Sequence, residues 1–308
     1  MIRTIAAAFL FLAPAGAQDA SPTQLAKSGA GEGPAWHNGF LYFSGGGKIS
    51  RLGPDGKVSV FRDPSGGSNG LMFDPQGRLI VCEAQNRRLT RTEADGSLTV
   101  LADNYEGKRF NSPNDLTMDS KGRIYFSDPR YGRRDGMELD TEGVYRIDAP
   151  GKVTRVLGKE VERANGVLVS AGDKYLYVAD NNNNNTGGAR KLWRFTLKAD
   201  GSLIAGSRKL LHDWKDSRGP DGVKADTKGV LYVAGGLNQP HPPHETNVRK
   251  GGIYVLSPEG KLLRFVPIPV DEVTNCAFGG PDLKTLFITA GGTLWSLPVA
   301  SPGRLAGR

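Results

Sequence analysis

The sequence has few of the residues that mark a disulfide-stapled or zinc-binding protein. Its 308 residues include only two cysteines and four histidines, and no C-x-x-C pair or Cys/His spacing suggests zinc. Cys82 and Cys276 each lie in an apolar, strand-like run, in repeat units that are not adjacent. An exported protein could form a disulfide, but this placement predicts two buried free thiols.

Long apolar runs are also missing, which argues against a membrane span. Residues 5–13 are apolar but too few to cross a bilayer. A positive start at 1–3 precedes them, and the tripeptide Ala-Gly-Ala at 15–17 follows as an A-x-A cleavage site. We expect a signal peptide at 1–17, a single mature domain at 18–308, and a periplasmic or secreted protein.

The basic charge is not concentrated in any segment. The formal net charge is +8, yet Lys and Arg are scattered and form no basic helix or aromatic-interleaved patch of the kind that binds nucleic acid. We therefore expect no nucleic-acid partner. We also expect a monomer or weak oligomer. The 42 Gly and 19 Pro residues suit many short strands joined by tight turns.

An internal repeat organises the chain. Six short apolar runs start 38 to 55 residues apart, and most follow an Asp-x-x-Gly turn. A second alternating, β-rich segment trails each run, and often a third. Strand, strand, turn and strand, repeated six times, predicts an all-β, six-bladed β-propeller. The runs occupy residues 41–43, 79–81, 124–126, 176–178, 231–233 and 286–288.

The last repeat stops after its second predicted strand, near Ala300. A propeller is a closed ring, so another segment must complete this blade. Residues 23–27, just after the predicted signal peptide, are the expected N-terminal closing strand.

One polar residue lies nine to eleven positions before every apolar run. Equivalent positions of a propeller meet around its axis, so two carboxylates and four amides should share one small volume. Calcium takes six to eight oxygen ligands of these kinds. Asn-Gly and Asp-Gly also form common turns, but Glu is a poor turn residue and recurrence in all six units favours a cation site. The six residues are Glu32, Asn69, Asn114, Asn165, Asp221 and Asn275.

Several long motifs resemble the SMP-30/gluconolactonase/LRE family, and more closely its bacterial gluconolactonase branch. They include most of 69–92, Glu-Gly-Lys-Arg-Phe-Asn-Ser-Pro-Asn-Asp at 106–115, Tyr-Phe-Ser-Asp-Pro at 125–129, and the final-blade segment 275–286. The resemblance covers nearly the whole mature chain. It implies a six-bladed propeller that opens a sugar lactone with one divalent cation in its central channel.

The resemblance also implies roles for four residues. Glu32, Asn165 and Asp221 correspond to the family's metal ligands, and Asp221 also to its proposed proton acceptor. Asn114 corresponds to an asparagine that touches substrate and completes the metal shell in some members. We expect calcium, with zinc, magnesium and manganese left open.

The family resemblance accounts for only some of the expected substrate contacts. The animal branch has an arginine two residues before the Asn-Asp pair, where this chain has Ser112. Arg109 lies nearby and is the candidate substitute. Asn69 and Asn275 are expected to hydrogen-bond the sugar hydroxyls.

Two other functions stay open. The same metal could serve hydrolysis of an aryl ester or organophosphate, or it could only stabilise a non-catalytic binding module. Three further motifs are interpreted as structural. Gly-Gly-Ser-Asn-Gly at 66–70 is a turn, because no helix follows as a nucleophile elbow requires. The loop 180–188, with five successive asparagines at 181–185, is expected to be a flexible surface turn. His241 and His244 lie in a tract expected to be an exposed loop on the face opposite the ligands.

Overall fold

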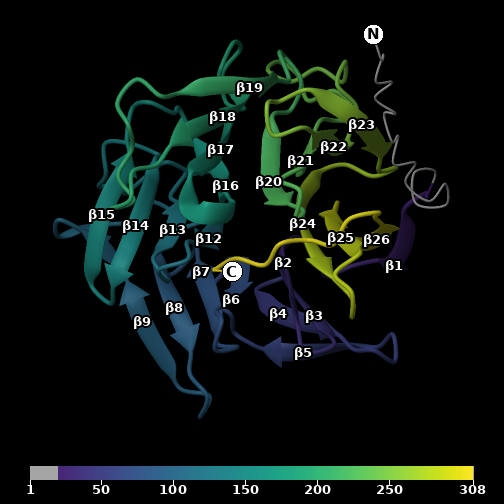
Figure 1. Cartoon of the computed structure of the whole chain (residues 1–308), viewed down its shortest axis with the longest axis horizontal. Coiled ribbons are helices and arrows are strands. Elements are labelled where there is room, and N and C mark those ends of the chain that lie inside the picture. The colour runs from purple at the N-terminus through teal and green to yellow at the C-terminus, as the bar shows by residue number, and fades with distance from the viewer. Residues whose placement is uncertain (1–19, 308) are drawn as a thin grey trace, which may run out of the picture.

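The described residues of this chain, 20–307, fold as a six-bladed β-propeller in the computed structural model (Figure 1). The predicted signal peptide lies outside the described residues. Each blade is a four-stranded antiparallel sheet. The blades are numbered in chain order, and blade 1 is the sheet that begins with β2. Among the described residues, no helix is long and apolar enough to cross a membrane.

The blades share one order, with the first strand nearest the axis. Blades 1 and 2 are β2 (Glu32–His37), β3 (Phe40–Gly45), β4 (Lys48–Leu52) and β5 (Val58–Arg62), then β6 (Ser68–Phe73), β7 (Leu79–Glu83), β8 (Arg88–Thr92) and β9 (Leu98–Ala102). Blades 3 and 4 are β12 (Leu116–Met118), β13 (Ile124–Ser127), β14 (Val144–Ala149) and β15 (Lys152–Leu157), then β16 (Ala164–Val169), β17 (Tyr175–Asn181), β18 (Arg190–Thr196) and β19 (Lys209–Asp213). Blades 5 and 6 are β20 (Pro220–Ala225), β21 (Leu231–Gly235), β22 (Gly252–Leu256) and β23 (Leu262–Pro267), then β24 (Val273–Gly279), β25 (Thr285–Ala290), β26 (Thr293–Pro298) and β1 (Thr23–Ala26). A hairpin of β10 (Asn104–Tyr105) and β11 (Lys108–Arg109) and a 3-10 turn at Ala171–Asp173 complete the elements.

The six-bladed prediction is confirmed, but each blade has one strand more than the sequence pattern suggested. The predicted apolar runs are the second strands, and a further innermost strand precedes each of them. These innermost strands were missed because they carry Gly, Pro and polar residues, as in Glu-Gly-Pro-Ala-Trp-His of β2, which are poor strand formers.

Closure by the N-terminal strand is also confirmed. β1 pairs antiparallel with β26, so that Thr23 lies opposite Ser296 and Gln24 opposite Trp295. The chain itself supplies only three strands of blade 6 near its C-terminus, and β1 fills the fourth place. β1 and β26, which lie near the two ends of the described residues, are thereby joined in one sheet (Figure 1).

The core lies between neighbouring blades, and this explains why the second strands are continuously apolar. In β3, Leu41 and Phe43 pack toward Phe287 of blade 6, whereas Tyr42 packs toward Val81 of blade 2. Successive side chains of a strand point to opposite faces. A blade sandwiched between two others therefore buries both faces.

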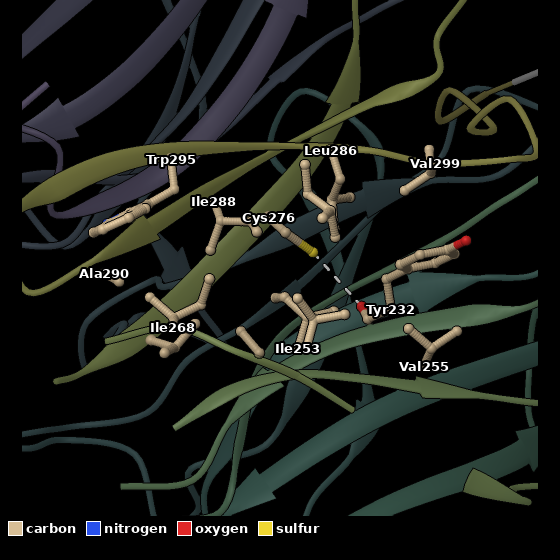
Figure 2. Packing of buried hydrophobic residues seen from close by; sticks show 14 of the residues in the cluster. Tyr232, Ile253, Val255, Ile268, Cys276, Leu286, Ile288, Ala290, Trp295 and Val299 are labelled. Carbon is tan, nitrogen blue, oxygen red and sulfur yellow. Dashed lines mark hydrogen bonds between the residues drawn. The ribbon is translucent and has the colours of Figure 1, made fainter. Parts of the chain in front are cut away.

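Figure 2 shows one such interface, between blades 5 and 6, where Cys276 packs beside Ile253 and Ile288. Its thiol donates to the main-chain carbonyl of Tyr232 at 3.6 Å. Cys82 is buried in the interface of blades 2 and 3, and both cysteines are free. The prediction of two buried free thiols is confirmed.

The C-terminal segment crosses the channel end where the innermost strands finish (Figure 1). The main-chain N–H of Arg304 donates to the Ala225 carbonyl at 3.0 Å, and that of Gly307 to the Met118 carbonyl at 3.2 Å. This end is mainly apolar and encloses a cavity of about 100 Å³. Its walls include Trp36, Phe73, Val167, Phe278 and Leu305. Polar residues gather at the other end.

Candidate functional site

The six polar residues predicted to face the axis, here called the axial ring, lie where the innermost strands begin. Five of them are in strands β2, β6, β16, β20 and β24, and Asn114 lies just before β12. They are therefore not turn residues, which removes the alternative interpretation of their recurrence.

Hydrogen bonds and close approaches link the innermost strands of neighbouring blades beside the ring, and between blades 3 and 4 the N–H of Val167 donates to Asp115 Oδ2 at 3.3 Å. The N–H of Gly70 donates to the Asn114 carbonyl at 2.7 Å. The amide Nδ2 of Asn275 donates to Glu32 Oε2 at 3.2 Å, which joins the last blade to the first. A β-carbon at Gly222 would overlap the Asn275 side chain. The ring therefore closes around the axis.

Glycine after a ring residue permits this approach. A β-carbon at Gly33 would overlap the Asn69 carbonyl, and one at Gly166 would overlap the Asp221 carbonyl. The glycines of the Asn-Gly and Asp-Gly pairs thus serve contact between strands, not turn formation.

Replacing Gly166 by Ala is expected to lower the free energy of unfolding by about 1–3 kcal/mol, as overpacking does, because blades 4 and 5 must separate. Gly31→Ala is the matched control, since its added carbon would lie no nearer than 3.5 Å to any neighbour. Urea unfolding of both variants tests this, and equal midpoints would contradict it.

Three oxygen atoms of the ring are buried without a hydrogen-bond donor from the protein. They are Oδ1 of Asn69, of Asn165 and of Asp221. Buried polar atoms normally have a partner, so three unsatisfied acceptors in one ring fit a bound hard cation. Among the described residues, no three His, Cys, Asp or Glu side chains gather as ligands. A metal here would therefore be held by mixed carboxylate and amide oxygens.

The ring carboxylates are poorly accommodated as charged groups. Burial, and then the charge of Asp115, raises the pKa of Glu32 to about 7. Burial, and then the charge of Glu32, raises the pKa of Asp221 well above its usual value. A cation between them would offset both effects.

Two cationic side chains approach the ring region and already have carboxylate partners. Lys224 Nζ lies 3.5 Å from Asp115 Oδ2. Arg218 places Nη2 3.7 Å from Asp221 Oδ2 and Nη1 2.8 Å from Glu272 Oε1. Asp221 therefore turns one oxygen toward Arg218 and keeps its other oxygen, Oδ1, without a donor.

The expected substrate residues are placed differently. Asn69 belongs to the ring with a buried, unpaired carbonyl oxygen. The Asn275 amide is used within the protein, since its Nδ2 donates to Glu32 and its Oδ1 accepts from the Cys276 N–H at 2.9 Å. Arg109 is not brought into the ring. It lies exposed on the β10–β11 hairpin, where its carbonyl accepts from Arg87 at 3.3 Å.

The histidine tract lies on the same side as the ring, so the prediction of the opposite face is wrong. β21 runs antiparallel to β20 and ends at Gly235, opposite Pro220, so the following loop emerges at the ring end. His241 Nδ1 lies 3.6 Å from Glu272, the partner of Arg218. The error follows from the missed innermost strand, which reverses the direction assigned to the second one.

The asparagine-rich loop is only partly a surface turn. Asp180 and Asn181 are buried, and Asn181 Oδ1 accepts from the Gly219 N–H at 3.2 Å. The tip is exposed, and there Thr186 Oγ1 hydrogen-bonds His244 Nδ1 at 3.1 Å. The two loops therefore meet at the end of the channel where the ring lies.

Tyr131 was missed by sequence reasoning altogether. It lies in the loop after β13, and its hydroxyl is 3.0 Å from Asn165 Nδ2. No repeat or spacing marks this residue, because it lies in the long loop between β13 and β14, outside the strands that form the repeat.

Fold and site together define a six-bladed propeller with an axial ring of carboxylates and amides. The chain belongs to the SMP-30/Gluconolactonase/LRE-like family, whose profile matches residues 30–292. It is 31% identical over 288 residues to a gluconolactonase of Zymomonas mobilis, covering 84% of this chain and 75% of the relative. It is 31% identical over 270 residues to a 6-deoxy-6-sulfogluconolactonase of Pseudomonas putida, covering 84% and 82%.

A solved structure gives the same result. A gluconolactonase from Xanthomonas campestris superposes with a TM-score of 0.77 and 31% identity, covering 93% of this chain and 91% of that one.

Proposed function

We propose that this protein is a hydrolase that opens a sugar lactone at the axial ring, with a divalent cation held by Glu32, Asn114, Asn165 and Asp221. The observation that carries the proposal is the set of buried, unpaired ring oxygens beside two carboxylates of raised pKa. The lactonase names of the relatives support the substrate class.

Calcium is the proposed ion because the donors are all oxygen, whereas zinc and copper favour His or Cys. When bound, the ion would supply Lewis-acid polarisation of a carbonyl oxygen and positive charge for the developing oxyanion. The chain's part is to present ligand oxygens at fixed positions, which the close contacts between innermost strands achieve.

Asp221 is the proposed general base. Lactone opening consumes one water, breaks the ring C–O bond and leaves a carboxylic acid and an alcohol. Asp221 would accept the proton of the attacking water. Asn69 is proposed to contact a sugar hydroxyl, and Asn114 to touch the substrate beside the cation.

Asn275 is proposed to act indirectly, because its amide holds Glu32 in place. From the predicted signal peptide at 1–17, we also propose a periplasmic or extracellular setting for the reaction.

A small substrate panel tests the function. Calcium-loaded protein should hydrolyse glucono-1,5-lactone well above the spontaneous rate, and faster than an aliphatic lactone or phenyl acetate. Proton release in a weakly buffered solution measures all three, with protein-free buffer as the control. Preference for phenyl acetate would replace the lactonase proposal by an esterase. Protein that binds calcium but hydrolyses none of them would be a binding module.

A further inference from the structure

A tyrosine from one blade reaches the axial ring of the next. Tyr131 lies in the loop that follows β13 of blade 3, and its hydroxyl oxygen accepts from Asn165 Nδ2 of blade 4 at 3.0 Å. The same hydroxyl donates to the main-chain carbonyl of Asn181 at 3.2 Å. The Arg163 guanidinium lies 5.2 Å from the centre of the tyrosine ring. Arg163 is itself held by Glu142 at 3.0 Å.

This arrangement determines which way the Asn165 amide faces. A phenol has one proton, and here it is directed at the Asn181 carbonyl, which can only accept. Only a donor can then face the hydroxyl from Asn165, so the NH₂ group must point toward Tyr131. The carbonyl oxygen, Oδ1, is turned the other way, where it is buried and has no donor from the protein.

We propose that Tyr131 is a positioning residue that locks the Asn165 amide with its carbonyl oxygen toward the axial cation. The inference rests on the cation site of the proposed function and not on the identity of the lactone. It also gives a role to the first residue of the asparagine-rich loop. Asn181 fixes the tyrosine through its main chain and reaches Gly219, two residues before Asp221, through its side chain.

Tyr131→Phe tests the proposal because it removes only the hydroxyl. Outer-shell partners of metal ligands typically contribute about 10–100-fold to metal affinity, so the calcium Kd from titration calorimetry should rise by about that factor. Activity at saturating calcium should recover most of the wild-type kcat. Tyr175→Phe, at the start of β17 and at the end of blade 4 away from the ring, is the matched control and should leave the calcium Kd unchanged.

A second background separates orientation from general loosening. Asn165→Asp replaces the amide by a carboxylate, whose two oxygens are equivalent acceptors and need no fixed orientation. In that background, Tyr131→Phe should change the calcium Kd by less than about threefold, a strongly non-additive double-mutant cycle.

Each other outcome is informative. An equal loss of affinity in both backgrounds would show that Tyr131 acts only on packing and would overturn the proposal. An unchanged Kd in Tyr131→Phe would do the same. A kcat that stays low at saturating calcium would make Tyr131 part of the chemistry instead. Wild-type protein that binds no calcium would remove the cation site itself, and the positioning role with it.

Discussion

Asp221→Asn is expected to lower kcat/KM for the lactone by about 10³-fold or more, while raising the free energy of unfolding of the cation-free protein. The loss combines a general base, worth about 10²–10⁴-fold, with weaker binding of the cation. The gain arises because burial and the charge of Glu32 make the ionised carboxylate unfavourable in the folded state. A neutral amide of the same shape removes that cost.

The comparison variant is Asp226→Ala, on the turn that follows the same innermost strand. Asp226 Oδ1 accepts from the N–H groups of Lys228 and Val230, both at 2.9 Å, at the channel end away from the ring. Losing two such bonds should cost about 1–2 kcal/mol of stability with kcat/KM unchanged. Urea unfolding with EDTA and initial lactonase rates measure both. If Asp221→Asn kept full activity, the base and ligand assignments would both fail.

The fold and the ring were predictable because both follow from the six-fold internal repeat of the sequence. Each ring residue lies at nearly constant distance from an apolar run that must be buried on both faces. The constant distance means that the residues share one depth along the axis. A closed propeller then brings them together without any knowledge of side-chain geometry.

Two kinds of feature were not predicted from the sequence: the direction in which the second strands run, and the contacts made by loop residues. The innermost strands have low β-propensity and are stabilised by contacts with the innermost strands of adjacent blades. An example is the close approach of Gly166 in blade 4 to the Asp221 carbonyl in blade 5. Missing them put the His241 loop on the wrong face. Tyr131 reaches Asn165 across 34 residues of sequence from a loop without periodicity. Only the folded chain shows that contact.

The differences among the ring asparagines could not be predicted from the repeat either, because they depend on hydrogen bonds formed in the folded chain. Asn275 matches the repeat as well as Asn165 does, yet its amide is satisfied by Glu32 and its own neighbour. Asn69 and Asn165 keep unpaired oxygens. The repeat alone does not distinguish these three residues, whereas their hydrogen bonds separate Asn275, which supports Glu32, from two residues whose oxygens are open to a cation or a substrate.

Removing the cation with EDTA is expected to abolish lactone hydrolysis and to lower the thermal midpoint. Returning calcium at about 100 times its Kd should restore about 2.7 kcal/mol of stability, the amount set by mass action. For a domain of this size that corresponds to a rise of several degrees. Calorimetric scans with EDTA, calcium, magnesium, manganese or zinc measure it. An identical midpoint and rate with and without EDTA would contradict the proposed cation site.

The calcium effect should depend on pH through Glu32. Its pKa in the folded, cation-free protein is about 7 because of burial and the Asp115 charge, above the ordinary value of about 4.3. The protonated form favours folding, so this contribution to cation-free stability is complete below the ordinary pKa and is lost as pH rises through about 7. Calcium needs the ionised form, so its affinity should fall by about tenfold per pH unit below 7 for each proton displaced.

Calcium titrations between pH 5.5 and 8.5 test the coupling, with Glu32→Gln as the matched variant. Wild-type affinity should increase with pH and level off above about 8, and calcium should stabilise the protein most at that end. Glu32→Gln should bind more weakly at high pH and lose much of the dependence, keeping the part that comes from Asp221. A wild-type affinity that is flat across this range would mean that neither Glu32 nor Asp221 ligates the ion.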